Sequence, residues 1–215
     1  PVIAVSVFLT LAATALHENP GCRGPLRAGD DEYLYLFAQE VRRFYPFFPA
    51  TVARVRHDFE WRGYTFAAGT RAMLDIHGTN HDRHTWTDPG VFRPERFRRR
   101  PEDRFEFIAQ GGGQHATHHR CPGEWITLGL IKRALVMLAG EMTYQVPAQD
   151  LSIDFQRLPA LPRSGFVMTH VGGPTSAIVG SRRCRSNGLR MNRRGSRPCS
   201  ATRCSTRCPS RPSTT

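Results

Sequence analysis

The sequence predicts a mainly α-helical fold with a small β-sheet. Two long apolar stretches, residues 2–19 and 122–139, have the length and composition of buried helices. A third stretch, residues 32–44, follows a pair of aspartates that suit a helix start. Residues 51–76 instead alternate and are rich in β-forming side chains. With 215 residues and 40% apolar content, the chain has the size of about one domain with a core.

The first apolar stretch resembles a secretory signal peptide, down to the small residues Ala13 and Ala15. It lacks a basic segment in front of the apolar run, however, and it is short for a membrane span. We therefore predict a buried helix that ends before Pro20, and no membrane span. Because the chain begins with Pro1 rather than Met, we expect it to be a fragment of a longer protein.

Residues 21–29 are rich in turn formers, and Asp30 or Asp31 can cap a helix from Glu32 to about Phe44. Glu40 and Arg43 stand three residues apart on one face of this helix. Taken as a lone pair, they indicate a solvated ion pair that contributes a few tenths of a kcal/mol.

The β-rich region is punctuated by Gly63 and Gly69. Three segments of it read as strands of one small sheet: Thr51–Phe59, Trp61–Phe66 and Arg71–Ile76. Residues 80–90 form a turn-rich connection. After the last long helix, Thr143–Val146 and Gly165–Val171 are candidate strands on either side of a proline-punctuated loop.

A glycine loop, Gly111 to Gly113, runs toward Cys121 and the last long helix, for which Pro122 suits the first helical position. Cys121 thus sits just before a helix N-terminus, where free N–H groups and the helix dipole favour a thiolate, which is a good metal ligand. The N–H groups of Gly123 and Glu124 are candidate donors to a metal-bound sulfur. The glycines allow backbone to approach a flat cofactor. The alternative is an ordinary buried thiol.

Six histidines lie between residues 77 and 119, and histidine is a common metal ligand. The spacing His115-x-x-His118-x-x-Cys121 would suit zinc. No second cysteine lies near enough to complete a familiar zinc pattern, so zinc is the less favoured alternative.

The cysteine loop resembles the haem-binding signature of the cytochrome P450 superfamily, Phe-x-x-Gly-x-Arg/His-x-Cys-x-Gly, with extra residues in its middle. Its fixed points here are Phe107, Gly111, His119, Cys121 and Gly123. Longer loops of this form are similar to those of the fatty-acid peroxygenases, a branch that uses hydrogen peroxide. The order of the segments also matches the C-terminal part of the superfamily's fold, from residue 1 to about 171.

Two residues of the loop depart from that branch. His118 stands where relatives often have glycine, and Ala109 replaces their usual proline.

The resemblance implies haem b as cofactor, with its iron bound by Cys121. It implies that His119 meets a haem propionate and that Gln110 and Gly123 also contact the haem. It further implies a buried structural network, without a catalytic role, in which Glu40 and Arg43 are joined by the arginine of the segment Pro94-Glu-Arg-Phe97, which is Arg96. It assigns no catalytic residue within this chain.

By the same resemblance, the first helix crosses the distal face of the haem. Oxygen-activating members carry an acid followed by an alcohol there, whereas Leu9–Leu16 contains Thr10 and Thr14 without an acid, and Glu18 follows only at the helix end. This favours hydrogen peroxide as oxidant and a long-chain fatty acid as substrate, with no obligatory reductase. The fatty-acid carboxylate would then be held by an arginine that precedes Pro1 and would supply acid-base catalysis.

Two other functions remain open. A reductase-dependent monooxygenase shares all of these proximal motifs. The second alternative is a protein that is not an enzyme, either an inactive truncated product or a basic binding protein. We expect the 215-residue chain itself to be inactive.

Residues 172–215 differ in composition from the rest of the chain. They contain ten arginines and no acidic residue, and so carry +10 of the formal net charge of +12. They also hold four of the six cysteines, among Ser, Pro and Gly. We expect a disordered tail, whose attraction to nucleic acid would be non-specific. A frameshift or a mistaken gene end is its preferred explanation. The preceding part has only Cys22 and Cys121, as expected for a cytoplasmic protein.

Overall fold

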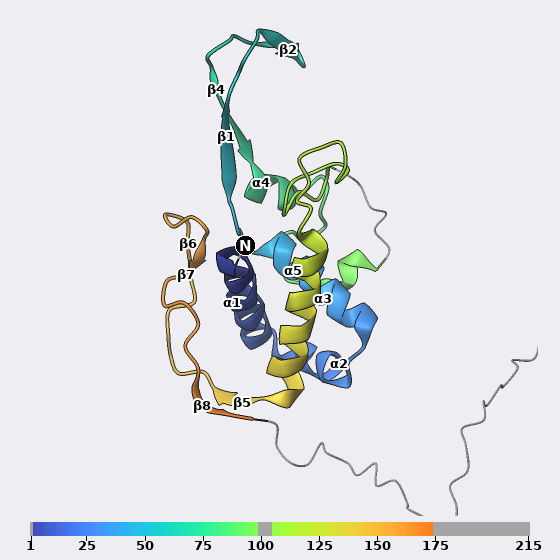
Figure 1. The fold of residues 1–215 in the computed structure, drawn as a ribbon, viewed down its shortest axis with the longest axis vertical. Helices are drawn as coiled ribbons and strands as arrows, with labels where there is room; N and C mark the ends of the chain where they lie inside the picture. Colours follow the sequence, from blue (N-terminus) through green and yellow to red (C-terminus); the bar gives the residue numbers. More distant parts are fainter. Residues whose placement is uncertain (1, 99–104, 174–215) are drawn as a thin grey trace, which may run out of the picture. The chain divides into compact units, whose positions relative to one another are not determined.

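Helices and two-stranded sheets make up the residues that the computed structural model describes, 2–98 and 105–173, all of which belong to one unit (Figure 1). The α-helices are α1 (Val2–Glu18), α2 (Arg23–Ala28), α3 (Asp31–Phe44), α4 (Ile76–Asn80) and α5 (Glu124–Val136). Two short 3-10 turns, η1 (Pro20–Cys22) and η2 (Pro94–Phe97), and one π-helical turn, η3 (Met137–Glu141), complete the helical elements. The mainly α class is confirmed.

The core lies where α1, α3 and α5 pack against one another (Figure 1). Each helix contributes apolar side chains with no exposed surface, and burial of each such side chain stabilises the fold by about 1.5–3 kcal/mol. They include Phe8, Leu11 and Leu16 of α1, Phe37 and Val41 of α3, and Ile131 and Leu135 of α5. The predicted buried helix before Pro20 is therefore present. Among the described residues, no helix combines the length and the apolar character needed to cross a bilayer.

The start of α3 follows from Asp30, whose side chain accepts hydrogen bonds from the N–H groups of Glu32 (3.0 Å) and Tyr33 (3.3 Å). Residues 21–29, which were expected to form turns, contain the short helix α2, which was not predicted. Tertiary contacts outweigh the poor helix propensity of this segment, because Arg23 and Arg27 donate to carbonyls at the C-terminal end of the α5 region, 2.9 and 3.3 Å away.

The β-rich region forms two separate antiparallel pairs instead of one sheet. Strands β1 (Ala50–Arg54) and β4 (Arg71–Asp75) make a ribbon with Val52 opposite Met73, and β2 (Phe59–Trp61) and β3 (Tyr64–Phe66) make a hairpin beyond it. The expected strand Thr51–Phe59 is broken because Asp58 accepts the N–H of Ala68 at 2.6 Å, which replaces strand pairing there.

The C-terminal part of the described chain also contains two pairs. Strands β5 (Thr143–Gln145) and β8 (Thr169–Gly172) lie within or near the predicted segments. A second pair, β6 (Ile153–Asp154) with β7 (Leu161–Pro162), was not predicted in the proline-punctuated loop. The predicted tail lies outside the described residues, apart from its first two positions, 172 and 173.

The last long helix begins later than predicted. Its first residue is Glu124, and Gly123 is the N-cap, so that Pro122 belongs to the preceding turn. The helix changes to a π-helical turn after Val136.

Candidate functional site

Cys121 is held between the glycine loop and the start of α5. Its N–H donates to the carbonyl of Gln110 at 2.9 Å, and its own carbonyl accepts the N–H of Glu124 at 3.2 Å. The N–H of Glu124 is thus bound to the Cys121 carbonyl and not to the sulfur. The thiol is half-buried, and its Sγ would lie 3.7 Å from a β-carbon placed on Gly123. A side chain at this position would therefore touch the sulfur, which glycine does not.

The loop glycines are required by the loop itself. Gly111 has a φ of +87°, and a β-carbon there would lie 1.8 Å from the carbonyl oxygen of His119. Gly113 has a φ of +82°, and its β-carbon would lie 2.5 Å from the ring of His118. Both positions therefore exclude a side chain by conformation and by space. The loop folds back on its own backbone before it reaches Cys121.

The structure brings Glu40, Arg43 and Arg96 together. The guanidinium of Arg43 donates to both oxygens of Glu40 at 2.8 Å, and Nε of Arg96 donates to one of them at 3.0 Å. The side chains of Glu40 and Arg43 have no exposed surface, and 6% of the Arg96 side chain is exposed. This group, the Glu40 network, is deeply buried.

The remaining donors of the Glu40 network bind backbone carbonyls. Arg43 donates to Asn80 (2.9 Å) and Pro89 (3.0 Å), and Arg96 donates to Thr87, Asp88 and Val91 (2.7–3.2 Å). Arg43 also lies 5.2 Å from the ring centre of Trp86. The network thus fastens residues 80–97 to α3.

A second buried network surrounds Glu124, and the sequence reading missed it. Arg42 donates to Glu124 at 2.6 Å, Arg120 donates to both carboxylate oxygens at 2.6 and 3.1 Å, and Nε2 of His115 lies 3.1 Å away. Only 2–3% of the Arg42 and Glu124 side chains is exposed. This group, the Glu124 network, joins α3, the cysteine loop and α5.

Charge keeps Glu124 ionised in these surroundings. Burial alone would raise the pKa of its carboxyl, but the hydrogen bonds from Arg120 and the charge of Arg42 outweigh burial. They hold the pKa at about 2, below its ordinary value of 4.5. In the sequence, Arg42 stands beside Arg43, and Glu124 follows Cys121 by three residues. Because Arg42 and Glu124 are 82 residues apart, no local spacing predicts that they meet.

Gln110, predicted to contact the cofactor, is bound by protein on both sides. Its side-chain oxygen accepts Nε of Arg42 at 2.9 Å, and its amide nitrogen donates to Thr127 at 3.4 Å. Its backbone carbonyl holds the N–H of Cys121. Gln110 therefore positions the Cys121 end of the loop against α3 and α5.

The histidines of the loop point to different partners. His115 meets Glu124 and stacks on Trp125, and Nδ1 of His118 accepts the N–H of Gln114 at 3.1 Å. His119 is exposed. Across residues 2–98 and 105–173, no three His, Cys, Asp or Glu side chains converge as metal ligands, so the zinc alternative gains no support.

The polar side chains of α1 are occupied within the protein. Thr10 and Thr14 each donate to a carbonyl one turn back in their own helix, at 3.0 Å, and Thr14 is fully buried. Glu18 accepts the hydroxyl of Tyr45 at 2.5 Å. The helix therefore presents no carboxylic acid beside its two threonines.

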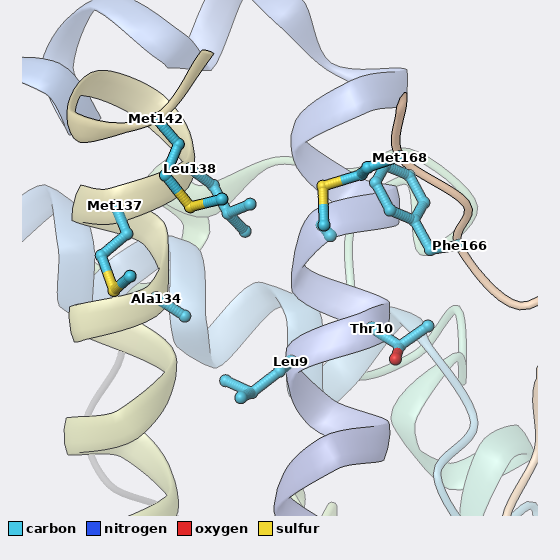
Figure 2. Close-up of a pocket in the computed structure, with 9 residues that line it drawn as sticks. Leu9, Thr10, Ala134, Met137, Leu138, Met142, Phe166 and Met168 are labelled. Carbon is cyan, nitrogen blue, oxygen red and sulfur yellow. The ribbon is translucent and has the colours of Figure 1, made fainter. Parts of the chain in front are cut away.

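An apolar groove of about 290 Å³ lies between α1 and the C-terminal end of α5 (Figure 2). Leu9, Met137, Met142 and Met168 face one another across it, and Thr10 supplies a hydroxyl. None of its lining residues belongs to the cysteine loop. The groove offers apolar contact without a reactive group.

Residues 32–150, which carry the Glu40 network and the cysteine loop, match the family model of cytochrome P450. The chain belongs to the cytochrome P450 family. The fold described above is accordingly part of the P450 fold, and the cofactor of this P450 is haem iron.

Curated relatives of this P450 include plant enzymes. It is 32% identical to cytochrome P450 71D18 of Mentha gracilis over 60% of this chain and 27% of the relative. It is 31% identical to 5-epiaristolochene 1,3-dihydroxylase of Nicotiana tabacum over 66% of this chain and 28% of the relative. The chain thus spans little more than a quarter of the length of these relatives.

Solved structures give higher similarity. Cytochrome P450SP alpha (CYP152B1), in complex with (R)-ibuprophen, is 56% identical with a TM-score of 0.75. Cytochrome P450EX alpha (CYP152N1) with myristic acid is 43% identical with a TM-score of 0.72. A variant of cytochrome P450 OleT in complex with arachidonic acid is 41% identical with a TM-score of 0.75. Each match covers 80–82% of this chain and 42% of the solved chain.

The residues around Cys121 fit a haem. The sulfur is partly accessible and is flanked by glycine, and a thiolate is a suitable ligand for haem iron. Large apolar side chains are exposed at the first turn of α5, directly after Cys121: Trp125 (59%) and Ile126 (68%). This surface suits an apolar macrocycle.

Proposed function

We propose that the intact protein is a haem-thiolate peroxygenase that oxidises long-chain fatty acids with hydrogen peroxide. The observation that carries the proposal is the 41–56% identity to the three CYP152-like structures, two of which are named with a bound fatty acid. The α1 helix gives independent support, because its threonines donate to their own helix and Glu18 binds Tyr45. A protein acid for dioxygen activation is missing from this part of the site.

In this proposal Cys121 binds the iron, and the bound haem supplies cleavage of the peroxide O–O bond and oxygen transfer. Gln110 and Glu124 fix the path of the loop, so that the sulfur stays in place. The exposed His119 is proposed to meet a propionate, and Gly123 leaves room next to the sulfur. Glu40, Arg43 and Arg96 keep their structural role on the proximal side.

No side chain of α1 is assigned the transfer of a proton. The fatty-acid carboxylate fills this role in the proposal, bound by an arginine outside this chain. The 215-residue chain alone is proposed to be inactive, because its matches cover only 42% of each solved relative, and the intact enzyme is proposed to act in the cytoplasm. The product, whether hydroxylated or decarboxylated, depends on residues that this chain does not contain.

The test compares oxidants on the haem-loaded full-length enzyme with myristic acid as substrate. Hydrogen peroxide alone is expected to support turnover, and NADPH with a reductase is expected to add nothing. Cys121→Ala should abolish turnover and the optical spectrum of a thiolate-bound haem with carbon monoxide. Turnover that requires NADPH and a reductase would contradict the proposal.

That contrary result would favour a reductase-dependent monooxygenase. The 31–32% identity to the plant enzymes named above is the observation that supports this second candidate. Both candidates share Cys121, so the oxidant and not the Cys121→Ala variant distinguishes them.

A further inference from the structure

Two histidines at α4, His77 within the helix and His81 as its C-cap residue, lie outside the haem site, and the proposed function gives them no task. His77 and His81 stand four residues apart, so their side chains fall on the same face of the helix turn. Their ring centres are 4.1 Å apart. Two imidazoles at this spacing are close enough to share one metal ion.

The hydrogen bonding of His81 prepares it as a ligand. Its Nδ1 lies 2.9 Å from the carbonyl oxygen of His77, which can only accept, so Nδ1 carries the proton and Nε2 carries the free lone pair. A metal-binding histidine usually donates its other N–H to a carbonyl or carboxylate in this way. The backbone thus selects the tautomer that a metal requires.

His77 carries an unsatisfied nitrogen. Its Nδ1 is buried and has no hydrogen-bond partner among the described residues. A buried polar atom without a partner costs about 1–3 kcal/mol. Because this atom is closed to solvent, a hydrated metal ion would bind the other nitrogen of the ring, Nε2.

Both rings are neutral near pH 7. Burial lowers the pKa of His77, although the charge of Asp75 opposes the shift. Burial, followed by the charge of His77, lowers the pKa of His81 to about 4, and Arg43 and Arg96 act in the same direction. Those two arginines are paired with Glu40, which limits their repulsion of a cation.

We propose that His77 and His81 form a binding site for one borderline divalent transition-metal ion, such as Zn²⁺ or Cu²⁺. Imidazole nitrogen is a preferred ligand for these ions, and water would complete the coordination. The site is independent of the haem and of the proposed oxidation. It would brace a helix of five residues that is too short to be stable alone.

The position of α4 gives such a site a structural consequence. Asn80, at the end of α4, accepts the N–H of Ile108 through its side chain (3.1 Å) and Arg43 through its carbonyl (2.9 Å). A metal on α4 would therefore stabilise the start of the cysteine loop and its link to α3. Its effect should appear as resistance to unfolding.

The first experiment measures thermal unfolding of the 215-residue chain as Zn²⁺ is added. A Zn²⁺ concentration about 100 times the dissociation constant is expected to raise the melting temperature by about 5 °C or more. His77→Gln and His81→Gln should each abolish the rise. The matched control, His57→Gln with His84→Gln, removes two exposed histidines and should retain it. A rise that persists in either single variant, or no rise in the wild type, would overturn the site.

A second measurement needs no variant and covers the case in which a substitution prevents folding. The cysteines of the wild-type chain are alkylated, one equivalent of Cu²⁺ is added, and the bound nitrogens are counted by pulsed electron paramagnetic resonance. Two imidazoles on one copper are expected. A single imidazole would contradict the proposal. Neither measurement depends on haem or turnover, so each can fail while the proposed function stands.

Discussion

Two neighbouring arginines of α3 lead to two different buried networks. Arg43 pairs with Glu40 in its own helix, and together with Arg96 it fastens residues 80–97. Arg42 pairs with Glu124, which lies 82 residues away, and this pair fastens the cysteine loop and α5. One helix therefore holds two separate parts of the chain through adjacent residues.

The two networks differ in what they position. The Glu40 network has both charged partners of its central pair fully buried, and its outer donors bind backbone carbonyls. The Glu124 network is wetter at its edge, where 18% of the Arg120 side chain and 29% of the His115 side chain are exposed. We infer that the Glu40 network contributes mainly to stability, whereas the Glu124 network also positions the loop that carries Cys121.

The largest effect is expected when Glu40 loses its charge. Glu40→Gln leaves Arg43 and Arg96 buried without an opposite charge, and removal of one partner of a buried pair costs about 3–5 kcal/mol. Urea unfolding of the chain, followed by circular dichroism, measures the loss in the free energy of unfolding. A loss near that of a surface ion pair would mean that Glu40 is not the centre of the network.

A smaller effect on stability is expected for Glu124→Gln, about 2–3 kcal/mol, because one partner at its edge is partly solvated. Glu124→Gln should weaken haem binding more than Glu40→Gln does, because the Glu124 network contacts the cysteine loop. Haem titration of the full-length enzyme, compared at equal folded fraction, should show weaker binding for Glu124→Gln than for Glu40→Gln. Weaker haem binding by Glu40→Gln than by Glu124→Gln would contradict the different roles proposed for the two networks.

Acid should weaken the Glu124 network in a defined range. The pKa of Glu124 is about 2 in the folded chain and 4.5 ordinarily, so its contribution is complete above about pH 4.5 and is lost as the pH falls toward 2. The contribution is on the order of 2 kcal/mol. Unfolding free energies of the wild type and Glu124→Gln, measured from pH 5 to pH 2.5, should converge in acid. A constant difference across this range would contradict the assignment.

The smallest effect is expected at a surface pair that serves as the control for both networks. Arg98 donates to Glu32 at 3.0 Å, but 51% and 61% of these side chains are exposed. Glu32→Gln should lower the free energy of unfolding by less than about 1 kcal/mol, because water and salt screen the pair. Added salt should remove what remains of the difference.

The sequence was sufficient for features that local patterns determine. The spacing of Glu40 and Arg43, the cap at Asp30 and the position of Cys121 before a helix all follow from rules over a few residues. Those rules predicted the mainly α class and the three core helices. The prediction that Arg96 would lie beside Glu40 came instead from the family resemblance, which supplied the long-range partner.

What the sequence could not provide depends on tertiary contacts. The pairing of Arg42 with Glu124 and the hydrogen bonds of Gln110 to α3 and α5 form only when the loop folds back. Helix α2 forms because Arg23 and Arg27 find carbonyls more than a hundred residues away. Pro122 lies outside α5 because the carbonyl of Cys121 accepts the N–H of Glu124, three residues on, as in a turn, whereas an α-helix pairs residues four apart.

The β1–β4 ribbon has a consequence for handling the chain. Neither of its outer edges is paired with another strand in the described part of the chain, and Val52 and Met73 leave 63% and 68% of their surface to water. Unpaired edges beside apolar side chains recruit strands from other molecules. Purified samples should therefore self-associate as they are concentrated, with light scattering that rises faster than protein concentration. Lysine substitutions at Val52 and Met73 should keep the chain monomeric.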